Sequence, residues 1–365
     1  MRALIDAHML GNQETGNETY ITGLIQGFES IKNATIGAAI SPSFCPEKSH
    51  PSIDILRLSH TNDWIRLLFS LPKLCRDWQA DILHTTYISP VYLPCASVVS
   101  VHDISFKLFP HFFSPRDRLL LNLFIPSSLR RADGVITISS YSKNEILKYY
   151  PFLEGKVHVI LLAPKPIYRT INENDFLKSV KYKFGINSTY LLFVGNLQPR
   201  KNLHRLIKAF SMISSDLNNV KLVVVGAAKW RSTDIFNLVR QYDLEDRLIF
   251  TGYVTDDELV ALYNLAEAFV FPSLYEGFGL PIQEAMACGV PVICSNTASM
   301  PEVAGDAAFY VDPYNEDEIA GAMLEIVKNK KLAESLSNRG SIWVKNFSWK
   351  KVAQDTVELY KGILN

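Results

Sequence analysis

The sequence predicts an α/β protein built from two open parallel sheets, each with helices on both faces. Three observations support this class. Short apolar strands alternate with amphipathic helical segments. The alternation starts again in the second half of the chain, after a segment that contains two prolines. The length of 365 residues also fits two domains better than one, because single domains usually contain about 100–200 residues.

In the first half, each expected strand is a short apolar run, and each expected helix repeats apolar residues at helical spacing. The strands are expected at Arg2–Ile5, Asp81–His84, Val98–Val101 and Val135–Ile138, and the helices at Glu18–Phe28, Trp64–Trp78, Pro115–Arg131 and Lys143–Tyr149.

The second half repeats this pattern with apolar and β-branched strands, and a last helix closes the chain. The strands are expected at Tyr190–Val194, Leu222–Val225, Leu248–Phe250, Ala268–Phe271, Val290–Cys294 and Ala308–Val311, and the last helix at Val352–Leu364. Between the halves, Leu162–Tyr168 contains Pro164 and Pro166. These prolines extend neither a sheet nor a helix, so the segment is interpreted as a linker.

Composition excludes several classes of protein. Lys plus Arg and Asp plus Glu both number 37, which argues against nucleic acid as a main partner. The five cysteines lack metal-binding spacing, and we expect reduced, mostly buried thiols. The first residues resemble a strand more than a signal peptide, and no stretch approaches the about 20 apolar residues of a membrane span. A cytoplasmic protein is therefore expected.

A loop and helix start between Phe271 and Gly289 form the first candidate site. Pro281 suits the first helical position and Gly289 suits the residue after the helix end, so a helix is expected from about residue 281 to 288. Gly277 and Gly279 let the backbone approach a ligand closely. The helix start can receive an anion such as a diphosphate.

Two glutamates give this segment its chemistry. Glu284, expected in the first helical turn, can accept hydrogen bonds from two ribose hydroxyls, and Glu276 in the loop can meet sugar hydroxyls. The structural alternative is that Glu276 is a loop charge and Glu284 a partner of the helix dipole. The combination with two glycines and a proline favours function.

The second candidate site is the turn Gly195–Asn202, which precedes an amphipathic helix with Asn202 as its expected N-cap. Arg200 and Lys201 stand at the helix start, where cations oppose the helix dipole. A bound anion would reverse this unfavourable effect. We therefore expect diphosphate binding, with the leaving group stabilised by two cations instead of a metal. The alternative is a solvated basic turn.

The third candidate is His102-Asp103, which follows a strand end where open sheets bind ligands. A structural pair that fixes a turn is the alternative. Weaker signals are Gly11 and Gly16 around a polar loop, and Thr251–Val254, whose backbone can contact a flat base.

Five motifs in order resemble one enzyme family nearly from end to end. They are E-x7-E at Glu276 to Glu284, G-N-L-x-P-R-K-N-L at Gly195 to Leu203, V-H-D at Val101 to Asp103, T-G-N-E-T-Y at Thr15 to Tyr20 and F-S-W at Phe347 to Trp349. The chain resembles the family-4 retaining glycosyltransferases of the GT-B fold, of the exopolysaccharide or lipopolysaccharide biosynthesis type.

The resemblance implies two Rossmann-like domains that face each other across a central cleft. The acceptor-side domain would be residues 1–165, completed by the last helix at 348–365, and the nucleotide-sugar-binding domain would be 166–347. One departure from the family pattern is Glu18, which replaces a glycine in the first loop. It puts the acceptor contacts of that loop in doubt more than the donor site.

The resemblance also implies residue roles. Glu276 would face the transferred hexose and Glu284 the ribose, Arg200 and Lys201 would hold the diphosphate, and His102 would lie beside the sugar. The implied catalytic residues are His102, Arg200, Lys201 and Glu276, and the implied donor contacts add Gly16, Gly195, Asn196, Tyr253, Val254, Phe278, Gly279, Leu280 and Glu284. Asp103 and Tyr20 are acceptor or structural candidates.

The implied reaction transfers a hexose from a nucleotide sugar to a glycan or lipid-linked glycan, with retention and without an essential metal or cofactor. UDP-glucose is the first expectation for the donor and GDP-mannose the second. The donor phosphate would take the acceptor's proton, whereas an inverting enzyme would need a base such as Asp103. The apolar and basic segments around Arg66–Arg76 and Arg116–Arg131 fit a peripheral membrane contact, although core helices share this pattern.

Other classes fit less well. A nucleotide-dependent dehydrogenase would need the spacing G-x-G-x-x-G, which Gly11 and Gly16 lack. A nucleotide-sugar epimerase of the same fold would bind the donor but show no acceptor-dependent transfer. A non-catalytic sugar-binding protein would not need the cations and acids described above.

Overall fold

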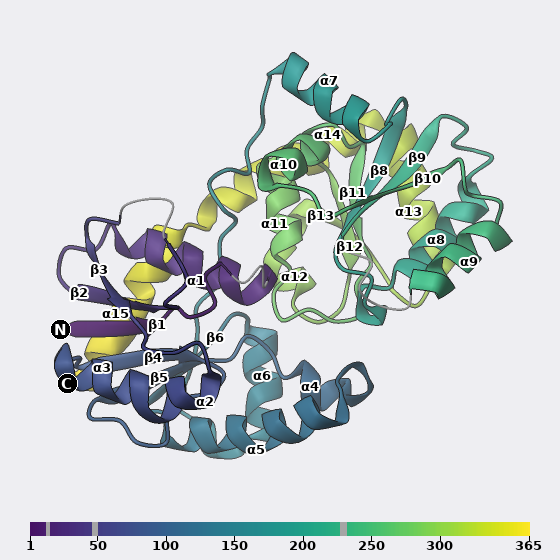
Figure 1. Cartoon of the computed structure of the whole chain (residues 1–365). Helices are drawn as coiled ribbons and strands as arrows, with labels where there is room; N and C mark the ends of the chain where they lie inside the picture. Colours follow the sequence, from purple (N-terminus) through teal and green to yellow (C-terminus); the bar gives the residue numbers. More distant parts are fainter. Residues whose placement is uncertain (12–14, 46–49, 227–231) are drawn as a thin grey trace. The chain divides into compact units, whose positions relative to one another are not determined.

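A computed structural model describes residues 1–11, 15–45, 50–226 and 232–365. The chain forms two compact units, Met1–Ala163 with Phe347–Asn365, and Pro164–Asn346 (Figure 1). The first unit is therefore discontinuous in sequence. In the described residues, no helix is long and apolar enough to cross a membrane.

The first unit is built on a seven-stranded parallel sheet with the order β3-β2-β1-β4-β5-β6-β7. Its strands are β1 (Arg2–Asp6), β2 (Thr35–Ile40), β3 (Ile53–Arg57), β4 (Ile82–Thr86), β5 (Ala96–Ser100), β6 (Gly134–Thr137) and β7 (Val157–Val159). Its helical segments are α1 (Thr15–Phe28), α2 (Asp63–Ile65), η1 (Arg66–Ser70), α3 (Leu71–Asp77), α4 (Ser105–Leu108), η2 (Pro110–Phe112), α5 (Pro115–Arg131), α6 (Ser140–Tyr149), η3 (Pro151–Leu153) and α15 (Trp349–Leu364).

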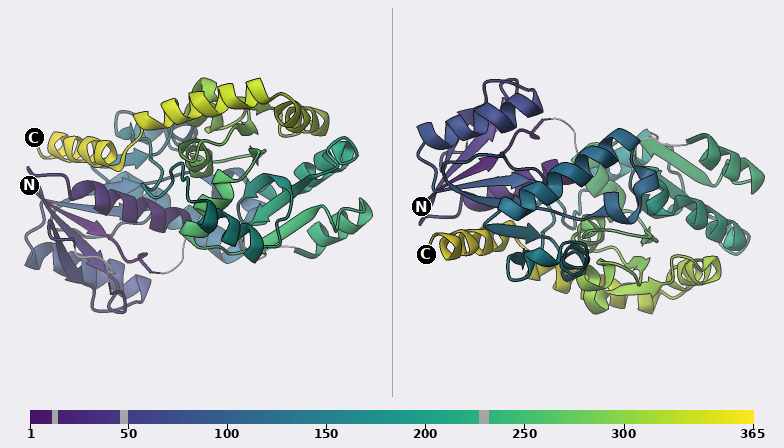
Figure 2. Two further views of the ribbon diagram at one scale, coloured as in Figure 1. Left: turned by 90° about the horizontal axis from the view of Figure 1, so that it is seen from above. Right: turned by 90° about the horizontal axis from the view of Figure 1, so that it is seen from below.

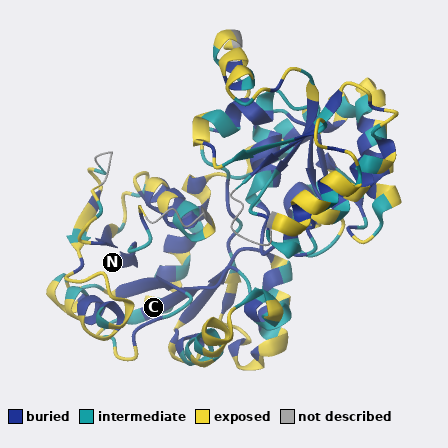
Figure 3. Cartoon of the chain, turned by 45° about the vertical axis from the view of Figure 1, so that its right-hand side comes forward, coloured by how far each residue is buried: buried dark blue, intermediate teal, exposed yellow. Residues whose placement is uncertain are grey.

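Helices cover both faces of this sheet, which is why its central strands are buried apolar runs (Figure 3). Apolar residues of α3 and α5 pack on one face. On the other face α15 lies along α1 (Figure 2). The close approach of these two helices depends on Gly23, because a Cβ atom there would lie 2.1 Å from Cε2 of the buried Trp349. The F-S-W motif thus fixes the last helix to the first unit.

The second unit has a six-stranded parallel sheet with the order β10-β9-β8-β11-β12-β13. Its strands are β8 (Thr189–Val194), β9 (Val220–Val225), β10 (Leu248–Gly252), β11 (Ala268–Phe271), β12 (Val292–Ser295) and β13 (Ala308–Val311). Its helical segments are α7 (Asn174–Lys183), η4 (Pro199–Lys201), α8 (Leu203–Ile213), α9 (Ser232–Gln241), α10 (Asp256–Asn264), α11 (Leu280–Ala287), α12 (Met300–Ala304), η5 (Gly305–Ala307), α13 (Glu316–Lys328), α14 (Lys330–Trp343) and η6 (Val344–Asn346). An apolar core joins this sheet to α8, α9 and α13.

The expected single helix Trp64–Trp78 is wrong in detail. The segment consists of α2, a π-helical turn at η1, and α3. Pro72 lacks an N–H and its ring disturbs the preceding turn, and a π-helical turn is one way to accommodate such a residue. This turn also carries the buried Arg66, whose guanidinium pairs with the buried Asp6 at the end of β1.

The sequence did not indicate strands β2, β3 and β7, which all lie on the outer parts of the first sheet. β2 contains small residues, β3 is partly exposed, and β7 has only three residues. None of the three therefore forms the apolar run that identifies a buried strand.

Candidate active site

The second unit brings together the candidate residues of two separate loops. Arg200 and Lys201 lie in η4 after β8, and Glu276 lies in the loop after β11. Arg200 Nη1 is 2.8 Å from Glu276 Oε2, and Lys201 Nζ is 2.6 Å from Glu276 Oε1. The two cations and the carboxylate therefore form one ion-paired triad. The alternative of a solvated basic turn is wrong, since Lys201 is buried.

The triad keeps Glu276 ionised. Burial of this side chain acts to raise its pKa, but the charges of Arg200 and Lys201 outweigh burial and lower the pKa to about 2. Lys201 Nζ also lies 4.9 Å from the centre of the Phe271 ring, a distance that allows a cation–π contact. The site thus presents two cations and one anion at any pH near neutrality.

Asn202 occupies the predicted N-cap position of α8, and its side chain joins the two loops. Its side chain makes no capping hydrogen bond to α8. Instead, its φ of 62° places it in the left-handed region, and Nδ2 donates to the carbonyl oxygens of Pro272 and Pro313 at 2.9 and 2.6 Å. Asparagine tolerates this conformation better than most residues. The turn is therefore fixed to the ends of β11 and β13.

Ser299 holds the loop between β11 and α11 through two hydrogen bonds. Its Oγ lies 2.9 Å from the carbonyl oxygen of Glu276 and 2.7 Å from that of Phe278. Gly279 follows with a φ of 109° and occupies the N-cap position of α11. Leu280 is the first helical residue, and Gly289 follows the helix end as predicted. These contacts hold the Glu276 backbone next to the helix start.

Glu284 lies in the second turn of α11, so its expected position in the first turn is wrong. The helix begins at Leu280, so Glu284 lies one turn further along and not among the first helical residues. Its Oε2 accepts a hydrogen bond of 3.2 Å from the hydroxyl of Tyr263 on α10. Burial raises the pKa of Glu284 to about 7.

Glycine backbone forms the neighbouring edge of this sheet. Gly195 and Gly226 follow β8 and β9, and Gly226 N donates to the carbonyl oxygen of Gly252 at the end of β10. A Cβ atom on Gly226 would lie 2.0 Å from the carbonyl oxygen of Gly195, so only glycine fits there. The glycines thus lie at the carboxyl ends of the strands, the edge at which open sheets bind ligands.

Other predicted donor residues lie along the same edge. Asn196 follows Gly195, and its buried Oδ1 has no hydrogen-bond partner among the described residues. Tyr253 is 72% exposed, whereas Val254 is buried. The Tyr253 ring is therefore accessible to a ligand.

In the first unit, His102 is buried directly after β5. Tyr20 and Tyr87 face its ring edge-on, with ring centres 4.6 and 5.7 Å away. Burial lowers the pKa of His102 to about 4, so the ring is neutral. Its Nε2 has no hydrogen-bond partner among the described residues. This nitrogen is the feature of His102 that suits a sugar hydroxyl.

Asp103 and Tyr20 have structural partners. Asp103 Oδ1 accepts a 2.8 Å hydrogen bond from Ser105 N at the start of α4, which fixes the turn. The Tyr20 hydroxyl lies 2.8 Å from Ser100 Oγ within a buried polar network. Gly16 is exposed near the start of α1. Of the loop between Gly11 and Gly16, residues 12–14 lie outside the described part of the chain.

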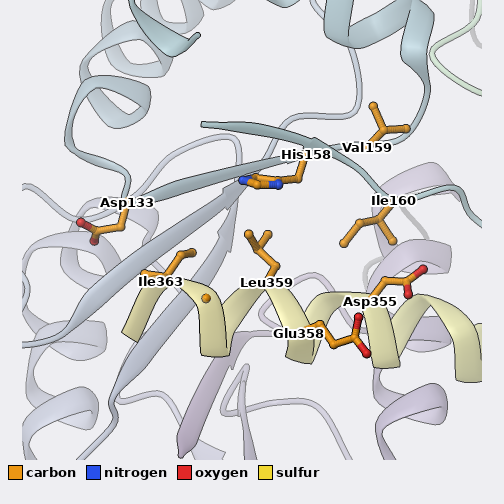
Figure 4. A pocket seen from close by; sticks show the side chains of 9 residues that line it. Asp133, His158, Val159, Ile160, Asp355, Glu358, Leu359 and Ile363 are labelled. Carbon is orange, nitrogen blue, oxygen red and sulfur yellow. The ribbon is translucent and has the colours of Figure 1, made fainter. Parts of the chain in front are cut away.

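A groove of about 690 Å³ in the first unit lies between β7 and α15 (Figure 4). Its lining consists of Asp133, His158, Val159, Ile160, Asp355, Glu358, Leu359, Gly362 and Ile363. None of these residues is a candidate site residue, so the groove is separate from the site predicted from the sequence.

Both units are similar in sequence to known proteins. Residues 36–162 match the family described as Glycosyltransferase Family 4, and residues 177–343 match Glycosyl transferases group 1. The O-antigen chain mannosyltransferase B of Escherichia coli is 34% identical over 292 residues, which cover 78% of this chain and 75% of that protein. The chain belongs to glycosyltransferase family 4.

Solved structures agree with this family-4 assignment at the level of the fold. Sucrose-phosphate synthase from Thermosynechococcus elongatus has a TM-score of 0.77 at 21% identity, covering 99% of this chain and 98% of the other. Anabaena HepE in complex with UDP-glucose has a TM-score of 0.74 at 19% identity, covering 99% of both chains. The predicted GT-B fold and the predicted glycosyltransferase family are therefore confirmed. The roles of individual site residues stay predictions.

Sequence reasoning missed the residues that support the two glutamates of this family-4 glycosyltransferase. Ser299 holds the Glu276 loop, and Tyr263 donates to Glu284. Neither lies near Glu276 or Glu284 in sequence, and each looks like an ordinary loop or helix residue. A signal that could have indicated Ser299 is its position as a polar residue after the strand β12.

Proposed function

We propose that this glycosyltransferase transfers mannose from GDP-mannose to a glycan or lipid-linked glycan, with retention and without an essential metal. The observation that carries the donor site is the Arg200–Lys201–Glu276 triad, which offers two fixed cations next to a helix start. The sequence favoured UDP-glucose, but the curated relative reported above is an O-antigen mannosyltransferase, and this supports mannose as the hexose.

Each candidate residue of the second unit would bind a different part of the donor. Arg200 and Lys201 would hold the diphosphate and stabilise the charge that develops on the leaving group. Their two charges would take the place of a metal ion. Glu284 would accept hydrogen bonds from the ribose, and the exposed Tyr253 would contact the base. Glu276 would accept hydrogen bonds from the hexose hydroxyls once the diphosphate shares its cations.

In the single-step route that the resemblance implies, the acceptor would attack on the face that the leaving group occupies, and the donor phosphate would take the acceptor's proton. The alternative is an inverting reaction with Asp103 as the base. Asp103 already accepts a hydrogen bond from Ser105 N in a turn. This structural task supports the phosphate over Asp103 as the proton acceptor.

A panel of nucleotide sugars tests this proposal. We expect donor hydrolysis and glycan transfer with GDP-mannose, less with UDP-glucose, and the same rates with and without EDTA. The anomeric configuration of the product is read by NMR. A preference for UDP-glucose would contradict the mannose assignment, and strong inhibition by EDTA would contradict the metal-free mechanism. No turnover with any donor would contradict the transfer reaction itself.

An exposed apolar surface on the first unit supports the lipid-linked form of the acceptor. Trp64 on α2 contacts Phe124 on α5, with ring centres 4.9 Å apart. Along the chain near this contact, α2, η1 and α5 expose large apolar side chains, and α3 and α5 expose basic side chains. The exposed apolar residues are Trp64, Leu68, Phe69, Leu119 and Leu123, and the exposed basic residues are Lys73, Arg76, Arg116, Arg118 and Arg130. Apolar side chains flanked by cations suit an anionic lipid surface.

Vesicle sedimentation tests this lipid contact. We expect the protein to bind vesicles that contain anionic lipid and the double variant Leu119→Ser with Leu123→Ser to bind them several-fold more weakly. Met212→Ser, at an exposed apolar residue of the second unit, is the matched control. Equal binding of all three proteins would contradict the proposed membrane surface.

A further inference from the structure

Asn202 lies where three loops of the second unit meet. It follows Lys201 directly in the chain, and its side chain is fully buried. One acceptor of its Nδ2, the carbonyl oxygen of Pro272 at 2.9 Å, lies in the loop that carries Glu276. The other acceptor, the carbonyl oxygen of Pro313 at 2.6 Å, lies in the turn between β13 and α13. One amide thus connects the turn that carries the two cations to the loop that carries their carboxylate.

Arg205 determines which way the Asn202 amide points. Arg205 lies in the first turn of α8, and its Nη1 donates to Asn202 Oδ1 at 3.0 Å. The amide oxygen is therefore turned toward the guanidinium, and the amide nitrogen is turned toward the two carbonyl groups. Because both hydrogens of the amide nitrogen and the amide oxygen have partners, these contacts specify a single orientation of the side chain.

The turn between β13 and α13 also contacts Arg205. Arg205 Nε lies 3.7 Å from Glu316 Oε1, and Arg205 Cζ lies 5.2 Å from the centre of the Tyr314 ring, a distance that allows a cation–π contact. Tyr314 N donates to Asp312 Oδ1 at 2.8 Å, which fixes the turn itself. Arg205 and Pro313 therefore connect the amide to this turn through two separate contacts.

The segment that carries the two cations is a single 3₁₀ turn, η4, of three residues. A backbone hydrogen bond of 2.8 Å from Leu274 N to the carbonyl oxygen of Arg200 holds it against the loop after β11. The Asn202 amide holds the end of the turn, directly after Lys201. Cations that are fixed before an anion binds lose less freedom on binding, and this raises the affinity.

We propose that Asn202, oriented by Arg205, is a positioning residue that fixes the two cations of η4 for the diphosphate of the donor. The inference rests on the proposed role of Arg200 and Lys201 in donor binding. Asn202 is fully buried and acts through the position of the turn, without touching the donor. The turn between β13 and α13, which carries none of the residues predicted from the sequence, is thereby part of the support of the donor site.

Asn202→Gly in the full chain tests this role, because glycine keeps the left-handed backbone conformation and removes only the amide. Asp243→Gly is the matched control, since Asp243 is exposed and also has a left-handed conformation, with a φ of 51°. Binding of inorganic pyrophosphate and of GDP is measured by calorimetry. We expect Asn202→Gly to weaken both about three- to tenfold, the effect of having to order one or two side chains on binding. Asp243→Gly should match the wild type.

Stoichiometry and kinetics separate this role from a loss of folded protein. Unfolded molecules lower the number of binding sites and kcat, but the sites that remain keep the affinity and the donor KM of the wild type. The proposal requires an unchanged number of sites with a weaker affinity and a higher donor KM. Fewer sites with unchanged affinity and KM would overturn it.

Arg205→Lys tests the orientation of the amide without the loss of a charge. Lysine lacks the planar fork with which Arg205 reaches both Asn202 and Glu316. We expect pyrophosphate binding to weaken about two- to threefold at an unchanged number of sites. An affinity equal to that of the wild type would refute the proposal, also where Asn202→Gly does not fold.

Binding by the wild type distinguishes a failure of this proposal from a failure of the proposed function. If the wild type binds pyrophosphate and GDP and both variants bind them equally well, the two cations form an anion site that Asn202 does not position. If the wild type binds neither, the anion site at Arg200 and Lys201 is wrong, and the proposal for Asn202 falls with it.

Discussion

The two glutamates of the donor segment lie eight positions apart and have opposite surroundings. Glu276 contacts two cations, and its pKa is held near 2. Glu284 accepts a hydrogen bond from the Tyr263 phenol, and its pKa is about 7. Burial acts on both side chains in the same direction, so the difference arises from the partners alone. One glutamate is a permanent charge, and the other changes its charge near neutral pH.

This difference shows that one motif contains two kinds of carboxylate. In the triad, the Glu276 carboxylate is ionised and paired without any ligand. It contacts the same two cations that a diphosphate would use. The site at Glu284 is weakly charged and needs its neighbours to ionise. Substitutions at the two positions should therefore differ in kind as well as in size.

The largest effect is expected for Glu276→Gln. The amide has lost the negative charge and one of the two accepting oxygens, so we expect transfer to fall by about 100-fold or more in kcat/KM. Pyrophosphate binding should stay equal or become tighter, because the amide does not compete for Arg200 and Lys201. Steady-state kinetics and calorimetry measure the two properties. Weaker pyrophosphate binding would show that Glu276 supports the anion site instead of competing for it.

A smaller effect is expected for Lys201→Ala. Removal of one charge-assisted contact should weaken nucleoside diphosphate binding by about 10- to 100-fold. Lys208→Ala is the control, since Lys208 is an exposed lysine of α8 that pairs with Glu316 at 3.4 Å. Thermal unfolding of each variant establishes that it is folded. Unchanged nucleotide affinity in Lys201→Ala would refute the anion site.

The smallest effect concerns stability at Glu284. Its carboxyl binds a proton in the folded state between about pH 4.5 and 7, where the unfolded chain has released it. The stability of the wild type therefore falls across this window as the pH rises. Glu284→Gln should remove this fall and be more stable than the wild type by about 1–2 kcal/mol at pH 8, with no gain at pH 4.

Thermal unfolding between pH 4 and 8 checks this sign, with the exposed Glu334→Gln as the control. A gain for Glu284→Gln that is the same at every pH would mean that a cause other than ionisation stabilises the variant. A loss at pH 8 would show that Glu284 is ionised and well paired in the free protein, and the contrast with Glu276 would disappear.

Much of the fold followed from local patterns in the sequence. The buried strands β1, β8 and β11 are apolar runs, and α5 matches its expected limits Pro115–Arg131. The glycine and proline positions around α11 located the donor loop. These features are local, because each depends on residues within one segment.

What the sequence could not reveal depends on contacts between distant residues. The partner of Glu276 is 75 positions away in Lys201, and Asn202 bonds to Pro313 across 111 positions. The π-helical turn at η1 accommodates Pro72 and brings Arg66 to Asp6 on another element. No local pattern specifies such pairings, so the sequence indicated the site residues without their partners.

The attachment of α15 to α1 has a consequence for the order in which the chain folds during synthesis. The second unit is continuous from Pro164 to Asn346, whereas the first unit includes Phe347–Asn365. The ribosome synthesises residues 1–163 first, but Gly23 of α1 packs against Trp349, which is synthesised much later. Since domains fold as units when their last segment becomes available, the second unit is expected to fold before the first is complete. The face of α1 that contacts α15 would then stay uncovered until residues 347–365 have been synthesised.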